Sequence, residues 1–68
     1  MPYLVRGDKG AAVAAAQAAL NYRGYNCGYV DGDFGAATAA AVASFKRDNG
    51  MNPSNTDIGK KTWTKLLE

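Results

Sequence analysis

Apolar and small side chains recur at helical spacing in three separate segments of this chain. In the first two segments they fall at positions i, i+3, i+4 and i+7, which lie on one face of an α-helix. The pattern predicts helices over about residues 9–23, 35–48 and 60–67. The residues predicted to face inward are Val13, Ala16, Gln17 and Leu20, then Thr38, Ala41, Val42 and Phe45, and finally Trp63, Leu66 and Leu67. The sequence therefore predicts an all-α fold, a small three-helix bundle with ordered loops.

One short sequence pattern precedes each predicted helix. It reads Asp, any residue, Gly, two further residues and then Val or Thr, and it begins at Asp8, Asp33 and Asp57. An aspartate at a helix N-cap accepts hydrogen bonds from backbone N–H groups that the first turn leaves free. We therefore expect these three aspartates to cap the helices. The first helix should end at Gly24 and the second before Gly50, since glycine is common at helix C-termini.

Gln17 is the one strongly polar residue on the apolar face of the first helix. A buried amide without hydrogen-bond partners is costly, so we expect the Gln17 side chain to bond backbone groups of the neighbouring loop. That loop, residues 24–33, contains three glycines together with Asn and Asp residues that favour turns. Thr38 and Thr62 lie in the first turns of their helices, where a hydroxyl can bond the backbone.

The composition allows one small domain, residues 1–68. The chain has 68 residues, of which 47% are hydrophobic, and a chain of this length buries too little surface for two cores. Alanine accounts for 13 of the hydrophobic residues, whereas Leu, Ile, Val and Phe together account for 11. This balance predicts close contact between helices, with Trp63 as the largest single contribution to the core. The net charge of +2 is too small to favour disorder.

Several kinds of chemistry are excluded by what the chain lacks. It has no histidine and one cysteine, so it cannot by itself form a zinc site, a Ser-His-Asp triad or an internal disulfide. The sequence therefore predicts no catalytic residues, no metal site and no cofactor. Cys27 itself is either a small buried residue or an exposed thiol.

Neither a membrane span nor a secretory signal is predicted. The longest uncharged stretches, residues 10–22 and 34–45, are shorter than the roughly 20 apolar residues of a spanning helix. No membrane partner is therefore predicted. The first residues lack the basic start and apolar run of a signal peptide, so we expect a mature or excised module.

Three stretches of the chain resemble the peptidoglycan-binding-domain-like family. The first is Arg-Gly-Asp-Lys-Gly-x-x-Val at residues 6–13, followed by Gln17, Leu20 and Gly-Tyr at residues 24–25. The most specific is Val-Asp-Gly-Asp-Phe-Gly at residues 30–35, continued by Thr, Ala-Val and Phe up to residue 45. The last is Gly-x-x-Thr-Trp-x-x-Leu at residues 59–66, so the resemblance covers about residues 4–67.

Four positions depart from that family pattern. Ala16 stands where Leu is usual, Lys46 where Gln is common and Met51 where Leu is common. Asn-Thr at residues 55–56 replaces a second Asp-Gly pair.

The resemblance implies a function in the bacterial cell wall. Members of this family are compact three-helix domains that bind peptidoglycan without catalysis and accompany wall hydrolases, amidases, carboxypeptidases or phage lysins. It thus implies an extracellular, wall-associated module, expected to be a monomer, whose partners are the glycan strand or stem peptide and an attached catalytic domain. The ligand surface is expected between residues 24–33 and the starts of the second and third helices.

Five residues are candidates for ligand contact. Tyr25 and Tyr29 could stack on sugar rings, Asp31 and Asp33 could accept hydrogen bonds from a stem peptide, and Arg6 could pair with a carboxylate. Each also has a local alternative. The aspartates suit a turn that leads into a helix cap, and loop tyrosines commonly cover a thin core.

Two other functions remain open from the sequence alone. Three short helices can resemble a helix-turn-helix, but the second helix is almost uncharged up to Phe45, and we predict no nucleic-acid partner. A protein-interaction module without wall affinity is the other alternative. Residues 44–68 hold five basic and three acidic residues, a surplus that suits either an anionic wall polymer or a solvated helix face.

Overall fold

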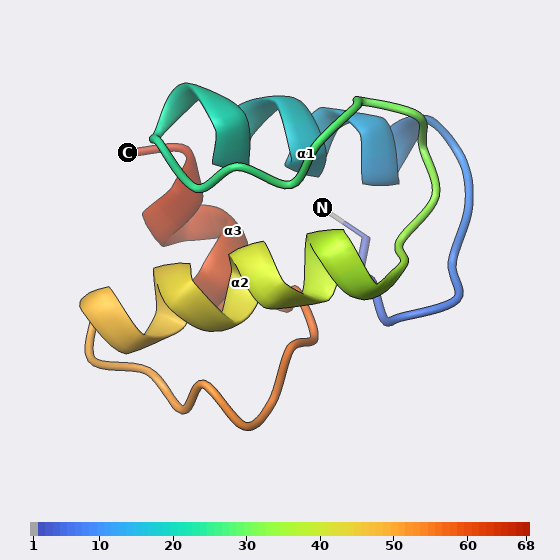
Figure 1. The fold of residues 1–68 in the computed structure, drawn as a ribbon. Coiled ribbons are helices and arrows are strands. Elements are labelled where there is room, and N and C mark those ends of the chain that lie inside the picture. Colours follow the sequence, from blue (N-terminus) through green and yellow to red (C-terminus); the bar gives the residue numbers. More distant parts are fainter. Residues whose placement is uncertain (1) are drawn as a thin grey trace.

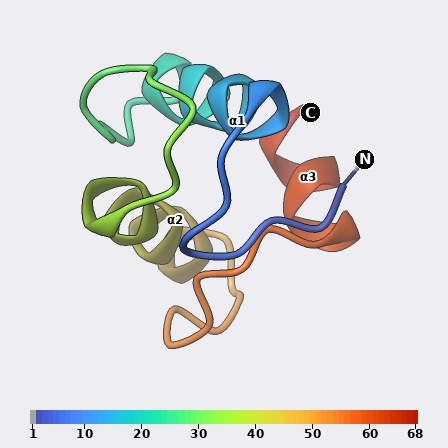
Figure 2. The same ribbon diagram turned by 90° about the vertical axis from the view of Figure 1, so that its right-hand side faces the viewer.

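Three helices form close to the positions that the hydrophobic pattern predicts. The computed structural model describes residues 2–68, with α1 at Ala11–Tyr22, α2 at Ala36–Asp48 and α3 at Lys60–Leu66. In Figure 1, α1 lies above α2, and α3 packs behind them. Figure 2 looks nearly along α1 and shows the three helices at the corners of a triangle. The predicted all-α, three-helix fold is confirmed.

The predicted apolar faces meet in one core between the helices. Its helical members are Val13, Ala16, Leu20, Ala39, Ala41, Val42, Phe45, Trp63 and Leu66, all buried. Trp63 is 3% exposed, and its ring N–H donates to the carbonyl oxygen of Pro2 at 2.7 Å. The predicted role of Trp63 in the core is therefore confirmed. Its single polar atom is also satisfied, which a buried tryptophan requires.

The alanines divide into two groups with different roles. Only Ala16, Ala39 and Ala41 are buried, and several others lie on exposed faces of α1 and α2. The expectation that the alanines as a group mark close helix contact is therefore only partly correct. The exposed alanines favour the helices through their high helix propensity.

The segments that precede the helices complete the core. Leu4, Phe34 and Ile58 are at most 5% exposed, although none lies on a helix. Leu4 and Ile58 exchange backbone hydrogen bonds of 3.0 and 2.8 Å in an isolated antiparallel bridge. The N-terminal segment and the segment before α3 accordingly run side by side in Figure 2. These irregular segments bury side chains that no helical pattern could identify.

The predicted aspartate caps are wrong. The N-cap residues are Gly10, Gly35 and Gly59, and no side chain caps any of the three helices. Each helix starts two residues later than a cap at Asp8, Asp33 or Asp57 would require. Glycine is itself acceptable at an N-cap, which leaves the aspartates free for other bonds. Asp8 accepts from the N–H of Val5, for example, and Asp57 from the hydroxyl of Tyr3.

The helix ends follow the predicted glycines. After α1, Gly24 N–H donates to Asn21 and Tyr25 N–H donates to Leu20, with Gly24 at a φ of 90°. These two bonds form a Schellman motif, which needs a left-handed residue at this point. The N–H of Met51 closes α2 in the same way by donating to Lys46. The prediction for Leu67 is wrong, since it follows the last residue of α3 and is 53% exposed.

Candidate functional site

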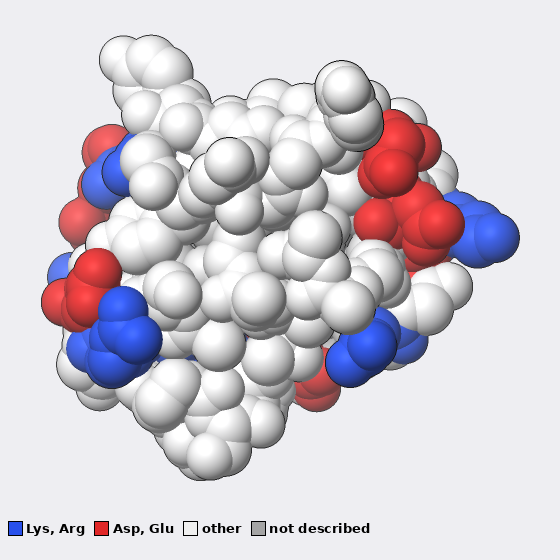
Figure 3. All heavy atoms as spheres, viewed as in Figure 1, with Lys and Arg blue, Asp and Glu red and all other residues white. Residues whose placement is uncertain are grey.

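A pocket of about 320 Å³ lies between the loop that follows α1 and the first turn of α2. Tyr29, Asp31 and Asp33 contribute from the loop, residues 35–38 from the start of α2, and Gln17 from α1. We call it the loop pocket. On the face shown in Figure 3, acidic side chains gather at the end of the molecule where this loop lies.

Gln17 connects the parts of the loop pocket. Its side chain is 1% exposed, and its Nε2 atom lies 3.0 Å from each of three acceptors. The acceptors are Asp31 Oδ1, the carbonyl oxygen of Asp33 and Thr38 Oγ1. Its Oε1 accepts from Gly32 N–H at 2.9 Å. The expectation that Gln17 bonds the neighbouring loop is confirmed, and the Thr38 hydroxyl oxygen accepts from Gln17.

A close backbone crossing at Gly32 fixes the loop against the start of α1. Gly10 N–H donates to the carbonyl oxygen of Gly32 at 2.9 Å, and Lys9 and Asp33 form an isolated antiparallel bridge. Gly32 has a φ of 73°, and a Cβ atom there would lie 3.0 Å from the oxygen of Gly10. Only glycine fits this crossing without strain. The Asp-Gly-Asp backbone is thus fixed beside α2, and both aspartates line the pocket.

Asp31 is held as an acceptor by two donors. Its Oδ1 atom accepts from Gln17 Nε2 and from Asp33 N–H, both at 3.0 Å. The Gln17 hydrogen bond, and after it the Asp33 backbone bond, lowers the pKa of Asp31 below its ordinary value. The exposed carboxylate therefore stays ionised to a lower pH than an ordinary aspartate does.

The pH dependence of the loop should follow the titration of Asp31. Its folded-state pKa is depressed, so the stabilisation is complete above the ordinary aspartate pKa of about 3.9 and is lost as the pH falls through the lower folded value. We expect the Gly32 and Asp33 amide resonances to move in that acidic window. Asp31→Asn, which keeps the Oδ1 acceptor, should flatten this transition, and Glu68→Gln should leave it intact. An unchanged transition in Asp31→Asn would show that another group controls the loop.

Tyr29 stands at the edge of the loop pocket on a firmly bonded turn. Its side chain is 91% exposed. Asn21 holds the preceding residues, because its Nδ2 donates to the Gly28 carbonyl at 3.0 Å and its Oδ1 accepts from Cys27 N–H at 2.8 Å. Asn26 Oδ1 accepts from Gly28 N–H at 2.8 Å. An aromatic ring is thus presented to solvent by a backbone with little freedom to move.

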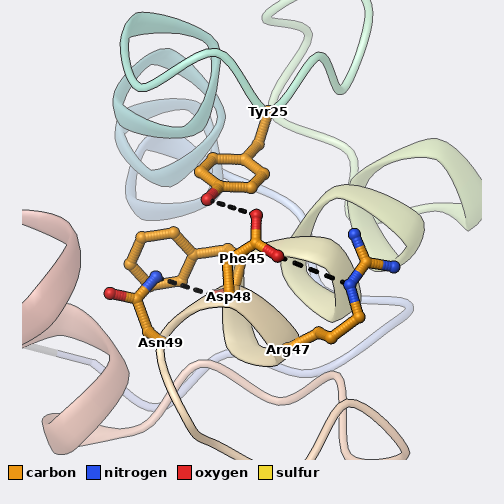
Figure 4. A network of polar contacts seen from close by, with 5 residues as sticks. All are labelled: Tyr25, Phe45, Arg47, Asp48 and Asn49. Atoms are coloured by element: carbon orange, nitrogen blue, oxygen red, sulfur yellow. Dashed lines mark hydrogen bonds and ion pairs between the residues drawn. The ribbon is translucent and has the colours of Figure 1, made fainter.

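Tyr25 lies in a different environment. Its ring packs edge-on against Phe45, with ring centroids 5.4 Å apart, and its hydroxyl donates to Asp48 Oδ2 at 2.8 Å. Figure 4 shows this contact together with the ion pair between Asp48 and Arg47 and the bond from Asn49 to the Phe45 carbonyl. The bond to Asp48 raises the pKa of the Tyr25 hydroxyl. Tyr25 thus extends the core and joins the loop to the end of α2.

The structure brings three of the five candidate residues together. Tyr29, Asp31 and Asp33 line the loop pocket, and among residues 2–68 its lining includes neither Tyr25 nor Arg6. The Arg6 side chain is exposed, and its neighbour Gly7 donates to the Phe34 carbonyl at 2.8 Å. The start of α3, expected beside the same surface, lines a separate pocket.

Cys27 and Thr38 also line the loop pocket, although neither was among the sequence candidates for ligand contact. Cys27 is 3% exposed, and its Sγ atom lies 3.3 Å from Asn21 Oδ1 and 3.4 Å from the Gln17 carbonyl. Of the two alternatives for Cys27, the small buried residue is therefore correct. Burial also raises the pKa of its thiol. The Thr38 hydroxyl was expected to bond the backbone, and it accepts from Gln17 instead. The one sequence feature that could have indicated a role for Thr38 at the pocket is its position as the last residue of the repeated pattern that begins at Asp33.

Within residues 2–68, no three His, Cys, Asp or Glu side chains lie close enough together to hold a metal ion. None of the helices in this part of the chain is long and apolar enough to span a bilayer.

Comparison with known protein families assigns the chain. The model of the family described as "Putative peptidoglycan binding domain" matches residues 9–66, which include α1, α2, α3 and the whole loop pocket. The chain belongs to this family. The resemblance of the three sequence stretches is thereby confirmed.

Known relatives and structures agree with this assignment. The domain is 42% identical over 66 residues to "Uncharacterized protein in bpoA1 3'region" of Kitasatospora aureofaciens, covering 96% of this chain and 55% of that protein. The SleB N-terminal domain superposes with a TM-score of 0.91 at 33% identity, covering 97% of this chain and 89% of that one. A Clostridioides difficile peptidoglycan-binding protein, in complex with glutamine hydroxamate, gives 0.88 at 38% identity over 96% of this chain and 40% of that one.

The same domain also occurs within a larger phage enzyme. The Burkholderia AP3 phage endolysin superposes with a TM-score of 0.89 at 34% identity, covering 96% of this peptidoglycan-binding domain and 24% of the endolysin chain. The chain likewise spans about half the length of its Kitasatospora relative. Family and structural neighbours together point to association with the bacterial cell wall.

Proposed function

We propose that this domain binds bacterial peptidoglycan at the loop pocket, does no chemistry itself, and holds an attached wall-active enzyme at its substrate. The main support is that the most specific family motif, residues 30–35, builds this pocket. Tethering raises the local concentration of a linked catalytic domain without any new catalytic contact. On this proposal the domain acts outside the cell, at the wall, as a monomer.

The pocket offers complementary groups to a wall fragment. The Tyr29 ring can pack against the apolar face of a sugar, while Asp31 and Asp33 can accept hydrogen bonds from hydroxyl or amide groups. No side chain caps α2, so the N–H groups of its first turn, residues 36–38, remain available to a carboxylate of a stem peptide. Hydrogen-bond donors and acceptors thus lie side by side, and a wall fragment made of sugar and peptide carries groups that complement both.

Tyr29→Ala should weaken binding to purified peptidoglycan by about three- to tenfold, because an exposed stacking ring contributes roughly 1 kcal/mol. Tyr22→Ala is the matched control, since Tyr22 is also 91% exposed and lies on α1 outside the loop pocket. Cosedimentation with insoluble sacculi over a range of protein concentrations measures both affinities. Equal losses in the two variants would mean that Tyr29 has no particular role.

Cosedimentation of the unaltered chain tests the function itself. We expect saturable recovery with sacculi at low and moderate salt, and little recovery with an unrelated insoluble polysaccharide such as cellulose. Arg6→Ala and Tyr25→Phe extend the test to the two candidates outside the pocket. If all of the protein remains in the supernatant at both salt concentrations, peptidoglycan binding by this chain is wrong.

A further inference from the structure

A lysine of α2 is buried without a carboxylate partner. Lys46 is 6% exposed, and lysine is almost never buried to this extent unless it is paired. Its Nζ donates to the Asn55 carbonyl at 2.6 Å. The ion pairs formed within residues 2–68 are those between Arg47 and Asp48 and between Lys65 and Glu68. Within this part of the chain, Lys46 therefore hydrogen-bonds a neutral carbonyl and forms no ion pair.

Lys46 lines a pocket of about 230 Å³ at the start of α3, which we call the lysine pocket. Asn55, the partner of its ammonium group, lines the same pocket, and so do the exposed residues Lys60 and Lys61. Tyr3 and Asp57 line it as well. The lysine pocket and the loop pocket have no lining residue in common among those the structure describes.

The charges around the lysine pocket do not balance. Three lysines face one carboxylate, that of Asp57, whose Oδ2 already accepts from the Tyr3 hydroxyl at 2.6 Å. Burial lowers the pKa of Lys46. The negative charge of Asp57 raises this pKa, but by less than burial lowers it. A buried cation with unused donors gains from an anion that brings matching acceptors.

We propose that the lysine pocket binds a phosphate group. All three of its cations are lysines, whose compact ammonium groups act as point charges toward tetrahedral phosphate, whereas arginine is the residue suited to planar carboxylates. Lys46 supplies a charge with reduced competition from water, and Lys60 and Lys61 contact the outer oxygens. The phosphate comes either from a free or terminal phosphomonoester or from a phosphodiester within an anionic wall polymer. This site does not depend on peptidoglycan binding at the loop pocket.

Amide chemical-shift titration of the whole chain tests the lysine pocket. The probes are inorganic phosphate, glycerol 3-phosphate and the diester glycerophosphoglycerol, with acetate at equal ionic strength as the carboxylate control. We expect saturable shifts at residues 55–62 with inorganic phosphate and weaker, non-saturating shifts with acetate. Lys46→Met keeps the aliphatic stem and removes the charge, and should weaken phosphate binding by about tenfold or more, the effect of losing a charged hydrogen bond.

Two further variants complete the design. Lys9→Met removes an exposed lysine that does not line the lysine pocket, and should bind phosphate like the unaltered chain. The double variant Lys60→Gln, Lys61→Gln alters only exposed side chains and should also weaken binding, which gives a test even if Lys46→Met fails to fold. Saturable binding of the diester would indicate that the pocket recognises an internal phosphate of a polymer. Saturable binding of the phosphomonoesters alone would indicate that it recognises a free or terminal phosphate. The proposal is overturned by absent saturation, by equal affinity for acetate, or by unaltered affinity in the lysine-pocket variants.

Discussion

Replacing Gln17 by alanine is expected to lower the free energy of unfolding by about 2–4 kcal/mol, a large part of the stability of so small a domain. The Gln17 amide bonds Asp31, Asp33 and Thr38 and accepts from Gly32, and the side chain is 1% exposed. The substitution removes all four bonds and leaves a cavity. Urea unfolding followed by circular dichroism measures the loss.

Gln17→Leu separates the two causes. Leucine fills most of the volume but leaves the partners of the amide unsatisfied, so we expect it to retain a cost of at least about 2 kcal/mol. Ala18→Ser, on the exposed side of the same helix turn, should change stability by less than about 0.5 kcal/mol. If Gln17→Leu is as stable as the unaltered chain, packing rather than hydrogen bonding explains the position.

Phe45→Ala is expected to leave the chain largely unfolded at 25 °C. Phe45 is 1% exposed and carries the edge-on contact with Tyr25. Removing a buried phenylalanine costs about 3–5 kcal/mol, which is comparable to what a core of this size supplies in total. Far-ultraviolet circular dichroism should show loss of helix without denaturant.

Phe45→Leu and Tyr25→Phe are the matched controls for this prediction. The first keeps most of the buried volume and should remain folded with a smaller loss. The second keeps the ring contact and removes only the exposed bond to Asp48, so its cost should be below about 1 kcal/mol. A cooperative, near-normal unfolding transition for Phe45→Ala would show that the core relies less on this contact than its burial indicates.

The helices could be predicted because their apolar positions are periodic. Leu20, Val42 and Trp63 each belong to the apolar face predicted for its own helix, and all three are buried. Phe34 and Ile58 could not be found in this way, because they lie in irregular segments where no period applies. Both stand between the Asp and the Gly of the repeated pattern, so the pattern orders a pre-helical segment and places glycine, not aspartate, at the cap.

The loop pocket could be predicted in part. The clustering of Asp31 and Asp33 beside α2, and the bonding of Gln17 to the loop, followed from turn chemistry and from the cost of an unpaired buried amide. The separation of Tyr25 from Tyr29 did not, because the three residues between them form an irregular loop in which no periodicity fixes the direction of a side chain. The burial of Lys46 could not be predicted from the sequence either, since it depends on how residues 50–58 pack beside α2.

The most direct test of peptidoglycan binding at the loop pocket is chemical-shift mapping with purified disaccharide-peptide fragments of peptidoglycan. We expect saturable shifts concentrated at residues 28–38, with Tyr29→Ala reducing the affinity and Tyr22→Ala leaving it unchanged. Saturable shifts centred on another surface, or no shifts at millimolar fragment, would contradict it.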